Sequence, residues 1–322
     1  MSANANHNTA PFHAGECAMQ DRAGVRDKLA HFSQQVIRDQ MPDQHRVFFA
    51  QLPFVVVGAV DAQGQPWASI LANPPGFIST ADAVTMHIDA SILPQDPLYA
   101  ALVPGAAIGL LGIEPHTRRR NRLNGVIEYI GAQGLSVKVN QSFGNCPKYI
   151  QARKPTYERH ASSSLPVVHR ASALDASARS IIEQADTFFI ATAHPHAGAS
   201  PISSQGVDVS HRGGKPGFVR VDDAHTLTAP DFIGNFFFNT LGNLTLNPRA
   251  GLLFIDFDHG DLLYLAVTAE ILWDGEALSE FAGAERLLRF SVQQVSRLSG
   301  AMPLRWGSAE LSPHLERTGH WK

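Results

Sequence analysis

Cysteine and charge are both scarce in this chain of 322 residues. Its two cysteines, Cys17 and Cys146, are too few for a disulfide framework or a structural zinc site, and such scarcity is typical of a reducing compartment. Charged residues make up 17% of the sequence, against about 25% in an average soluble domain. A surface so poor in charge indicates that part of it is covered in a homo-oligomer.

Other patterns are missing altogether. The net charge of −3 provides no broad basic surface for nucleic acid or an anionic membrane. No apolar run approaches the roughly 20 residues that a membrane span needs, and the polar stretch 1–16 lacks the basic and apolar regions of a signal peptide. No ligand set at a recognisable spacing indicates a metal site. We therefore expect a cytoplasmic protein whose partners are small molecules rather than nucleic acid, membrane or metal.

What the chain does contain is an internal repeat of strand-like segments. Apolar runs such as 54–60 and 188–193 predict buried strands. Three landmarks recur 134 to 142 residues later, namely Phe54 as Phe188, Gly76 as Gly217 and Gly109 as Gly251. This spacing is too long for a solenoid and indicates a duplicated β domain. A seven-residue insertion, placed within 203–214, distinguishes the second copy.

The repeat divides the chain into three parts. Residues 1–20 are expected to form a disordered tail, and 21–152 a helix followed by a degenerate barrel. Residues 153–322 are expected to form a linker helix near 176–185, a second barrel that binds the cofactor, and a C-terminal helix. The predicted fold class is mostly β with flanking helices.

A candidate phosphate site lies in the second copy. Residues 210–214 read Ser-His-Arg-Gly-Gly, in which arginine offers a fork of donors suited to phosphate and glycine lets another group approach the backbone. An exposed arginine in a tight turn is the alternative. Downstream, Asn235, Asn239 and Asn243 recur at every fourth position, and Asn239 is expected to N-cap a short helix whose N-terminus attracts phosphate. Asparagines that face solvent or cap turns are the alternative here.

Together these segments resemble a known family. The succession Ser-His-Arg-Gly-Gly, Pro-Gly-Phe, Pro-Asp-x-x-Gly-Asn, Phe-Asn-Thr-Leu-Gly-Asn and Asn-Pro-Arg-Ala-Gly-Leu-Leu-Phe, within about 185–273, resembles the pyridoxamine 5′-phosphate oxidase-like FMN-binding split barrels. The resemblance implies tandem split barrels, a homodimer, and FMN held where two barrels or two chains meet. Asn239 and Thr240 stand where the oxidases proper carry an Arg-Lys pair, which argues against oxidation of pyridoxamine phosphate. The phosphate is then left to Arg212 or to a cation from elsewhere.

The resemblance also implies a set of cofactor-binding residues around the phosphate and ribityl chain of FMN. They are Ser210, His211, Arg212, Gly213, Gly214, Pro230, Asp231, Gly234, Asn235, Asn239, Thr240, Asn243, Lys148 and Tyr149.

Two segments of the first half offer a further cation. The basic run 118–122 is either such a source or a solvated edge strand on which charge prevents aggregation. The segment 141–150, with Cys146 and Lys148, resembles the Cys-x-Lys segments that follow the last barrel strand in several flavin split barrels. Cys146 is either a reactive thiol or a buried structural cysteine, and the lack of a paired histidine favours the second.

The expected function is that of an FMN-dependent oxidoreductase. No side chain is assigned to catalysis, because the flavin itself carries the electron or hydride chemistry. A non-catalytic flavin or haem carrier on the same fold is the alternative, with His211 as the haem ligand. A scaffold without any cofactor is the third possibility.

Overall fold

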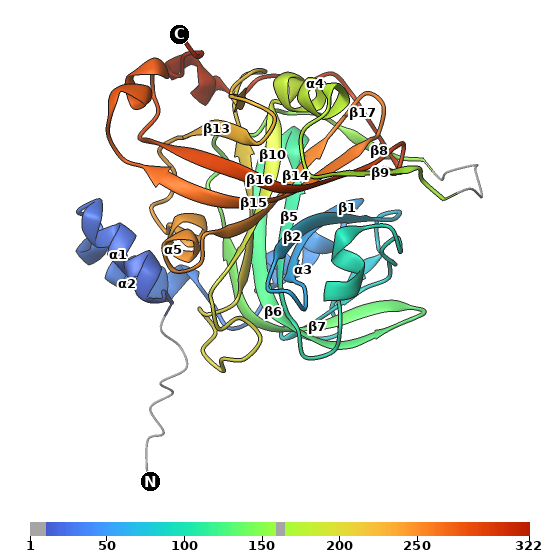
Figure 1. Cartoon of the computed structure of the whole chain (residues 1–322). Coiled ribbons are helices and arrows are strands. Elements are labelled where there is room, and N and C mark those ends of the chain that lie inside the picture. Colours follow the sequence, from blue (N-terminus) through green and yellow to red (C-terminus); the bar gives the residue numbers. More distant parts are fainter. Residues whose placement is uncertain (1–10, 159–164) are drawn as a thin grey trace.

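The computed structural model describes residues 11–158 and 165–322, which form two large antiparallel sheets with helices at their edges (Figure 1). The first part contains α1 (Ala14–Arg22), α2 (Arg26–Val36), α3 (Asp43–Ala50), β1 (Phe54–Val60), β2 (Pro66–Ala72), β3 (Ile78–Ser79), β4 (Thr85–Ile88), η1 (Pro97–Ala101), β5 (Ala107–Glu114), η2 (Pro115–Thr117), β6 (Arg119–Gly131) and β7 (Gly134–Gly144). The second contains β8 (Pro155–Tyr157), β9 (Val168–Ala171), α4 (Ala176–Gln184), β10 (Thr187–Ala193), β11 (Val207–Gly213), β12 (Arg220–Val221), β13 (Thr226–Asp231), α5 (Asn239–Leu246), β14 (Arg249–Ile255), β15 (Leu262–Leu272), η3 (Glu276–Glu280), β16 (Arg286–Leu298), β17 (Leu304–Trp306) and η4 (Pro313–Arg317).

The two sheets have the same strand order. The first runs β2-β1-β5-β6-β7-β4-β3 and the second β11-β10-β14-β15-β16-β13-β12, with β9 added alongside β16. Every strand of the first sheet therefore has a counterpart in the second, and η1 stands where the second copy has α5. The predicted class, mostly β with flanking helices and tandem split barrels, is confirmed. The exact domain boundaries at residues 21 and 153 stay a prediction.

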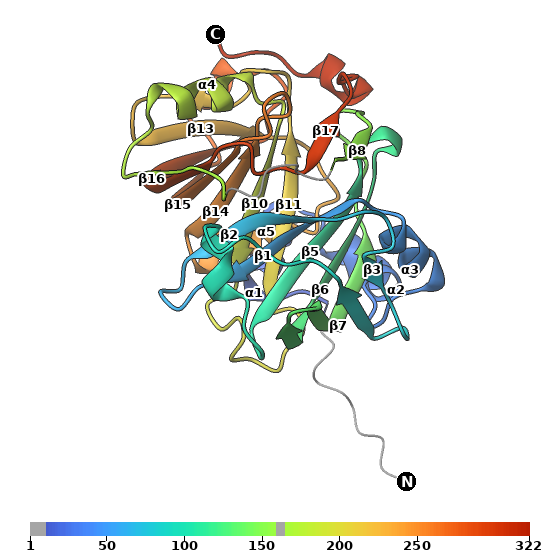
Figure 2. The ribbon, with the colours of Figure 1, turned by 90° about the vertical axis from the view of Figure 1, so that its right-hand side faces the viewer.

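Glycines at equivalent positions let the two sheets cross (Figure 2). A Cβ on Gly109 of β5 would lie 2.5 Å from the carbonyl oxygen of Val207, at the start of β11. A Cβ on Gly251 of β14 would lie 2.3 Å from the carbonyl oxygen of Pro66, at the start of β2. Any other residue would clash at these two points, so the glycines of the repeat are needed for the reciprocal contact between the copies.

The strands at this crossing are buried on both faces, which explains their uninterrupted apolar sequences. One continuous core contains Val57 and Leu110 of the first sheet together with Val209 and Leu253 of the second. The two copies thus share one hydrophobic core and do not form separate domains.

The N-terminal prediction is wrong over part of its length. Residues 14–20, expected in a disordered tail, belong to helix α1, which is closed by a capping box between His13 and Glu16. Of its four buried residues, Gly15, Glu16, Met19 and Gln20, only Met19 is a large apolar residue, so apolar periodicity did not reveal the helix. Residues 1–10 of the expected tail lie outside the described residues.

Two further expectations need correction. After β16 the described chain forms β17 and the short turn of helix η4, not a C-terminal α-helix. The extra length of the second copy lies in the loop 194–206, whereas 207–213 forms β11, the counterpart of β2. The helix expected near 176–185 is present as α4.

No helix within the described ranges is both long and apolar enough to cross a membrane.

Candidate functional site

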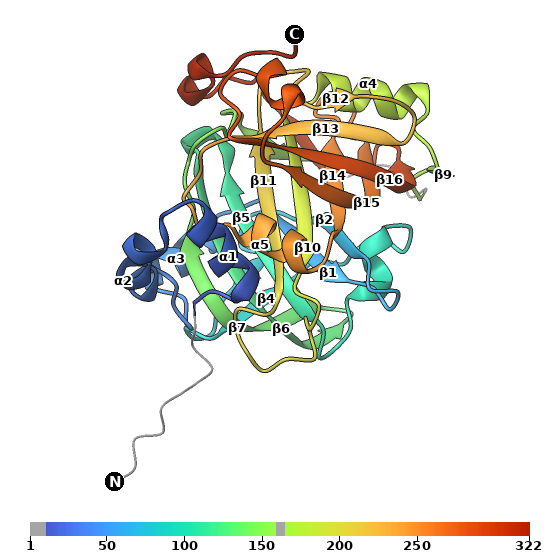
Figure 3. The same cartoon turned by 60° about the vertical axis from the view of Figure 1, so that its left-hand side comes forward.

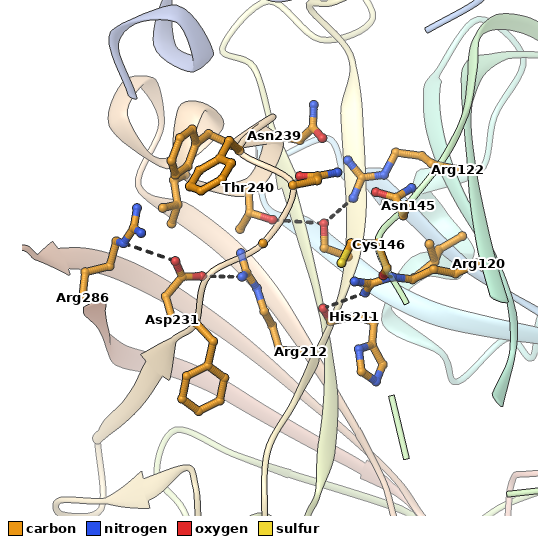
Figure 4. A pocket seen from close by; sticks show the side chains of 18 residues that line it. Arg120, Arg122, Asn145, Cys146, His211, Arg212, Asp231, Asn239, Thr240 and Arg286 are labelled. Carbon is orange, nitrogen blue, oxygen red and sulfur yellow. Dashed lines mark hydrogen bonds and ion pairs between the residues drawn. The ribbon is translucent and has the colours of Figure 1, made fainter. Parts of the chain in front are cut away.

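A pocket opens where the second copy's β11 meets β6 of the first (Figure 4). The enclosed part of the pocket has a volume of about 100 Å³, and a ligand of the usual size, for which sites of about 300–1,000 Å³ are typical, would extend from it towards the open mouth. The first copy contributes β6 and the segment after β7, and the second contributes β11, the segment 231–238, the start of α5 and Arg286 of β16. Both copies within one chain therefore contribute to the site.

Arginines dominate the lining. Arg120, Arg122, Arg212 and Arg286 all line the pocket, against a single carboxylate, Asp231. Because low-dielectric walls strengthen electrostatic attraction, such a lining favours a ligand with more than one negative charge.

Asp231 connects two of these arginines. Arg212 donates from Nη1 to Oδ1 of Asp231, and Nε of Arg286 lies 3.3 Å from Oδ2. Nε of Arg212 and Nη1 of Arg286 are buried and have no hydrogen-bond partner among the described residues. A buried donor without a partner costs about 1–3 kcal/mol, so an anionic acceptor placed between these groups would recover that free energy.

Arg122 belongs to a more deeply buried network. It donates from Nη1 to Asp208 Oδ1 at 2.9 Å and from Nη2 to the Val209 carbonyl at 3.1 Å. Asn124 and Asn243 also donate to the Asp208 carboxylate, at 2.8 and 2.9 Å. These contacts fix the guanidinium at the back of the pocket and balance its charge.

Arg120 lies beside His211, on the same side of the pocket as Arg122 (Figure 4). It donates from Nε to the Cys146 carbonyl at 2.6 Å and from Nη1 to the His211 carbonyl at 3.4 Å. Burial, with Arg122 and Arg212 nearby, lowers the pKa of Arg120 to about 10, so it stays charged at neutral pH. Burial and the same kind of positive neighbours lower the pKa of His211 well below its ordinary value, so its imidazole is neutral.

Helix α5 begins at the pocket and packs against α1 (Figure 3). Asn239 was expected to be its N-cap, but Phe238 holds that position and Asn239 is the first helical residue. The reason is Glu16 of α1, which accepts a hydrogen bond from Nδ2 of Asn239 and so draws its side chain away from the capping position. Burial, and secondarily Asp208, raises the pKa of Glu16 well above its ordinary value.

An aromatic wall faces the arginines. Phe232, Phe236 and Phe238 line the pocket, and the last two have positive φ values of 63° and 60°. Such a backbone costs of order 1–3 kcal/mol per residue and is found most often at ligand sites. The Phe236 and Phe238 rings are inclined by 59° to each other, and the Arg286 guanidinium lies 5.3 Å from the centroid of the Phe238 ring. The wall thus gives an apolar surface against which a ring system can pack.

A second cavity, called the side cavity below, adjoins the pocket and shares Arg120, His211 and Arg212 with it. Twelve of the fourteen residues predicted from the sequence line one of the two cavities. Those lining the pocket or the side cavity are Ser210, His211, Arg212, Gly213, Pro230, Asp231, Gly234, Asn235, Asn239, Thr240, Lys148 and Tyr149.

Gly214 and Asn243 line neither cavity. A Cβ on Gly214 would lie 2.2 Å from the Phe218 ring, and a Cβ on Gly213 would lie 2.0 Å from the Tyr149 carbonyl oxygen. These glycines thus give room to the chain's own groups, which corrects the expectation that they admit a phosphate.

The interpretation of 118–122 as an edge strand is wrong. Strand β6 lies between β5 and β7, and its alternation points Arg120 and Arg122 to the pocket. Arg118 instead pairs with Glu310 at 2.8 Å. Arg286 was not predicted from the sequence, because a single arginine at the start of an apolar strand does not indicate a binding site.

Comparisons with known proteins add little. No family model and no curated protein matches the chain. Three similar solved structures are a proposed pyridoxamine 5′-phosphate oxidase of Lactobacillus delbrueckii, an FAD-binding protein of Mesorhizobium loti and the haem storage protein HutZ of Vibrio cholerae. Their identities are 15%, 14% and 14%, their TM-scores 0.30, 0.27 and 0.27, and they cover 39%, 44% and 38% of this chain and 94%, 99% and 92% of their own. Similarity at this level leaves the site to be argued from the chain's own residues.

Proposed function

We propose that the pocket binds FMN and that the protein is an FMN-dependent oxidoreductase. The observation that carries the proposal is the group of buried arginine donors without partners, facing an aromatic wall. A phosphate offers acceptors for the first feature, and a flat ring system suits the second. The sequence resemblance implies the same cofactor.

In this arrangement Arg212 and Arg286 hold the phosphate, since both side chains line the pocket and both contact Asp231. Thr240 and Ser210, joined by a hydrogen bond of 3.0 Å, present hydroxyls to the ribityl chain. Phe232 and Phe238 exclude water from the ring. Bound FMN supplies one- or two-electron chemistry, and the protein supplies orientation and electrostatics.

A haem carrier is the competing function. The neutral imidazole of His211, whose Nδ1 has no partner among the described residues, is a plausible metal ligand. However, its ring packs against Phe189 with centroids 5.7 Å apart, and a Cβ on Gly213 would lie 2.9 Å from its Cε1 atom. This crowding leaves little room for a macrocycle, so FMN is favoured.

The test compares FMN with riboflavin, which lacks only the phosphate. The purified chain is desalted after addition of either flavin, and the retained flavin is measured by absorbance. We expect FMN to bind about 100-fold more tightly, because the phosphate pairs with charged donors. Arg212→Ala should remove most of that difference and leave riboflavin binding unchanged.

Arg289→Ala is the matched control, because Arg289 lies on the same strand as Arg286 but pairs with Glu270 at the surface. If Arg212→Ala changes FMN affinity by less than about threefold, the phosphate assignment is wrong. A Soret band that is lost in His211→Ala would establish the haem function instead. Homodimerisation and a cytoplasmic location remain proposals.

A further inference from the structure

The side cavity has an enclosed volume of about 60 Å³ and continues the pocket past Arg120 and Arg212. Its own residues come from the segment after β7 and from the second sheet: Lys148, Tyr149, Gly213, Phe218 and Pro230. It therefore opens directly beside the space that we assign to the cofactor.

The lining of the side cavity is cationic and contains no carboxylate. Arg120 donates to the Cys146 carbonyl and Arg212 to Asp231, but Lys148 makes no hydrogen bond or ion pair with any described residue. The Lys148 residue is also half-buried. A lysine without a partner that shares a cavity lining with two arginines favours an anionic ligand.

The remaining walls are aromatic. The rings of Tyr149 and Phe232 lie with centroids 5.0 Å apart, and Phe218 closes the far side. Tyr149 has a positive φ of 63°, and its hydroxyl donates to the Ile233 carbonyl at 3.2 Å, which holds the ring in place. Aromatic walls around a cation select a planar ligand that carries its charge at one end.

We propose that the side cavity binds a second ligand next to the flavin, a planar aromatic or conjugated carboxylate whose charged end pairs with Lys148. The inference rests on the proposed function, because it places the second ligand beside the cofactor. It moves Lys148 and Tyr149 from the cofactor site, to which the sequence resemblance assigned them, to the site of the reaction partner. The free donors of Arg212 and Arg286 already provide for the phosphate in the pocket, which neither Lys148 nor Tyr149 lines.

The test uses benzoate and benzamide, two flat rings of the same shape of which only benzoate is charged. The full chain is loaded with FMN, and each compound is titrated while the flavin absorption spectrum is followed. We expect benzoate to shift the spectrum and benzamide to bind at least about tenfold more weakly, because a hydrogen bond to a charged group is lost.

Variants then locate the charge. Lys148→Gln should weaken benzoate binding about tenfold and leave the affinity for FMN unchanged, and Lys148→Arg should restore it. Lys138→Gln is the control, because Lys138 is exposed on β7 and lines neither cavity. Since Lys148 makes no contact that the fold depends on, these variants should fold normally.

The outcomes separate the two proposals. Failure of the wild-type chain to retain FMN would overturn both. Retention of FMN with equal or absent responses to benzoate and benzamide would overturn only the second-ligand site. Weaker FMN binding in Lys148→Gln would also overturn it, because Lys148 would then belong to the cofactor site.

Discussion

The two copies meet at two equivalent junctions that differ in chemistry. Gly109 pairs with Gly58 and Asn124, and its counterpart Gly251 pairs with Ala191 and Ala266. The registers of the neighbouring strands, followed from these glycines, show which residues occupy equivalent positions in the two copies. Ser210 corresponds to Ser69, Arg122 to Tyr264, and Arg212 to Leu71.

At the junction around Gly109, Ser210 lines the open, arginine-lined pocket. At the second, Ser69 and the Tyr264 hydroxyl both donate to the carboxylate of Asp96, which caps η1. Ser69, Tyr264 and Leu71 are at most 2% exposed, so this junction is filled by its own side chains. The comparison teaches that duplication kept the backbone and one serine, while different side chains at the equivalent positions left only one of the two junctions open to a ligand.

The largest expected effect comes from Arg122→Met. Because Asp208 would lose its buried ionic partner, we expect a loss of about 3–5 kcal/mol in the free energy of unfolding, measured with urea. Tyr264→Phe, at the equivalent position, removes one hydrogen bond and should cost only about 1–1.5 kcal/mol. Equal losses in the two variants would break the distinction between a charged and a neutral junction.

The sealed junction should show a dependence on pH. Burial raises the pKa of Asp96 from 3.8 to about 6, so the folded state favours the protonated acid. The contribution of Asp96 to stability should therefore be fully present below about pH 4 and fall by up to about 1.4 kcal/mol per pH unit as the pH rises to about 6. Asp96→Asn should remove this contribution from urea curves recorded across that range. An unchanged slope would show that Asp96 ionises freely.

The binding of FMN is expected to have a smaller effect on the free energy of unfolding. The open junction alone should bind it, so titration followed by absorbance should give one equivalent of FMN per chain. A concentration of 100 times the dissociation constant should raise the free energy of unfolding by about 2.7 kcal/mol. Two equivalents per chain would mean that the sealed junction opens, and the comparison would fail.

The smallest effect is expected for Arg118→Ala. Arg118 belongs to the same basic run as Arg120 and Arg122, but its partner Glu310 is exposed and it lies outside the pocket. We expect a change in stability of at most about 1 kcal/mol and no measurable change in FMN affinity. A loss of affinity comparable to that of Arg212→Ala would show that the run acts as a diffuse field rather than through the two arginines that point inward.

Part of the site could be predicted from the sequence because its signals are local. The repeat of apolar runs and glycines predicts the duplication, and residues 210–214 and 231–240 lie close to the pocket because each is a short continuous segment. The role of Gly213 and Gly214 could not be predicted, since a glycine shows that something lies close but not what. Helix α1 was missed because its interface is polar and small rather than apolar.

The sequence by itself determined the β class, the duplication and the segment that carries Arg212, because strand periodicity and turn residues act over a few neighbours. Only the tertiary structure decided that Arg120, Arg122 and Arg286 join Arg212 around one pocket, that Glu16 holds Asn239, and that Tyr264 seals the equivalent junction. The physical reason is that these groups come from parts far apart in the chain. The crossing of the two sheets at Gly109 and Gly251 brings β6 to β11, and the packing of α1 against α5 brings Glu16 to Asn239. The sequence pattern of a single strand does not predict which side chains of the other copy will contact that strand.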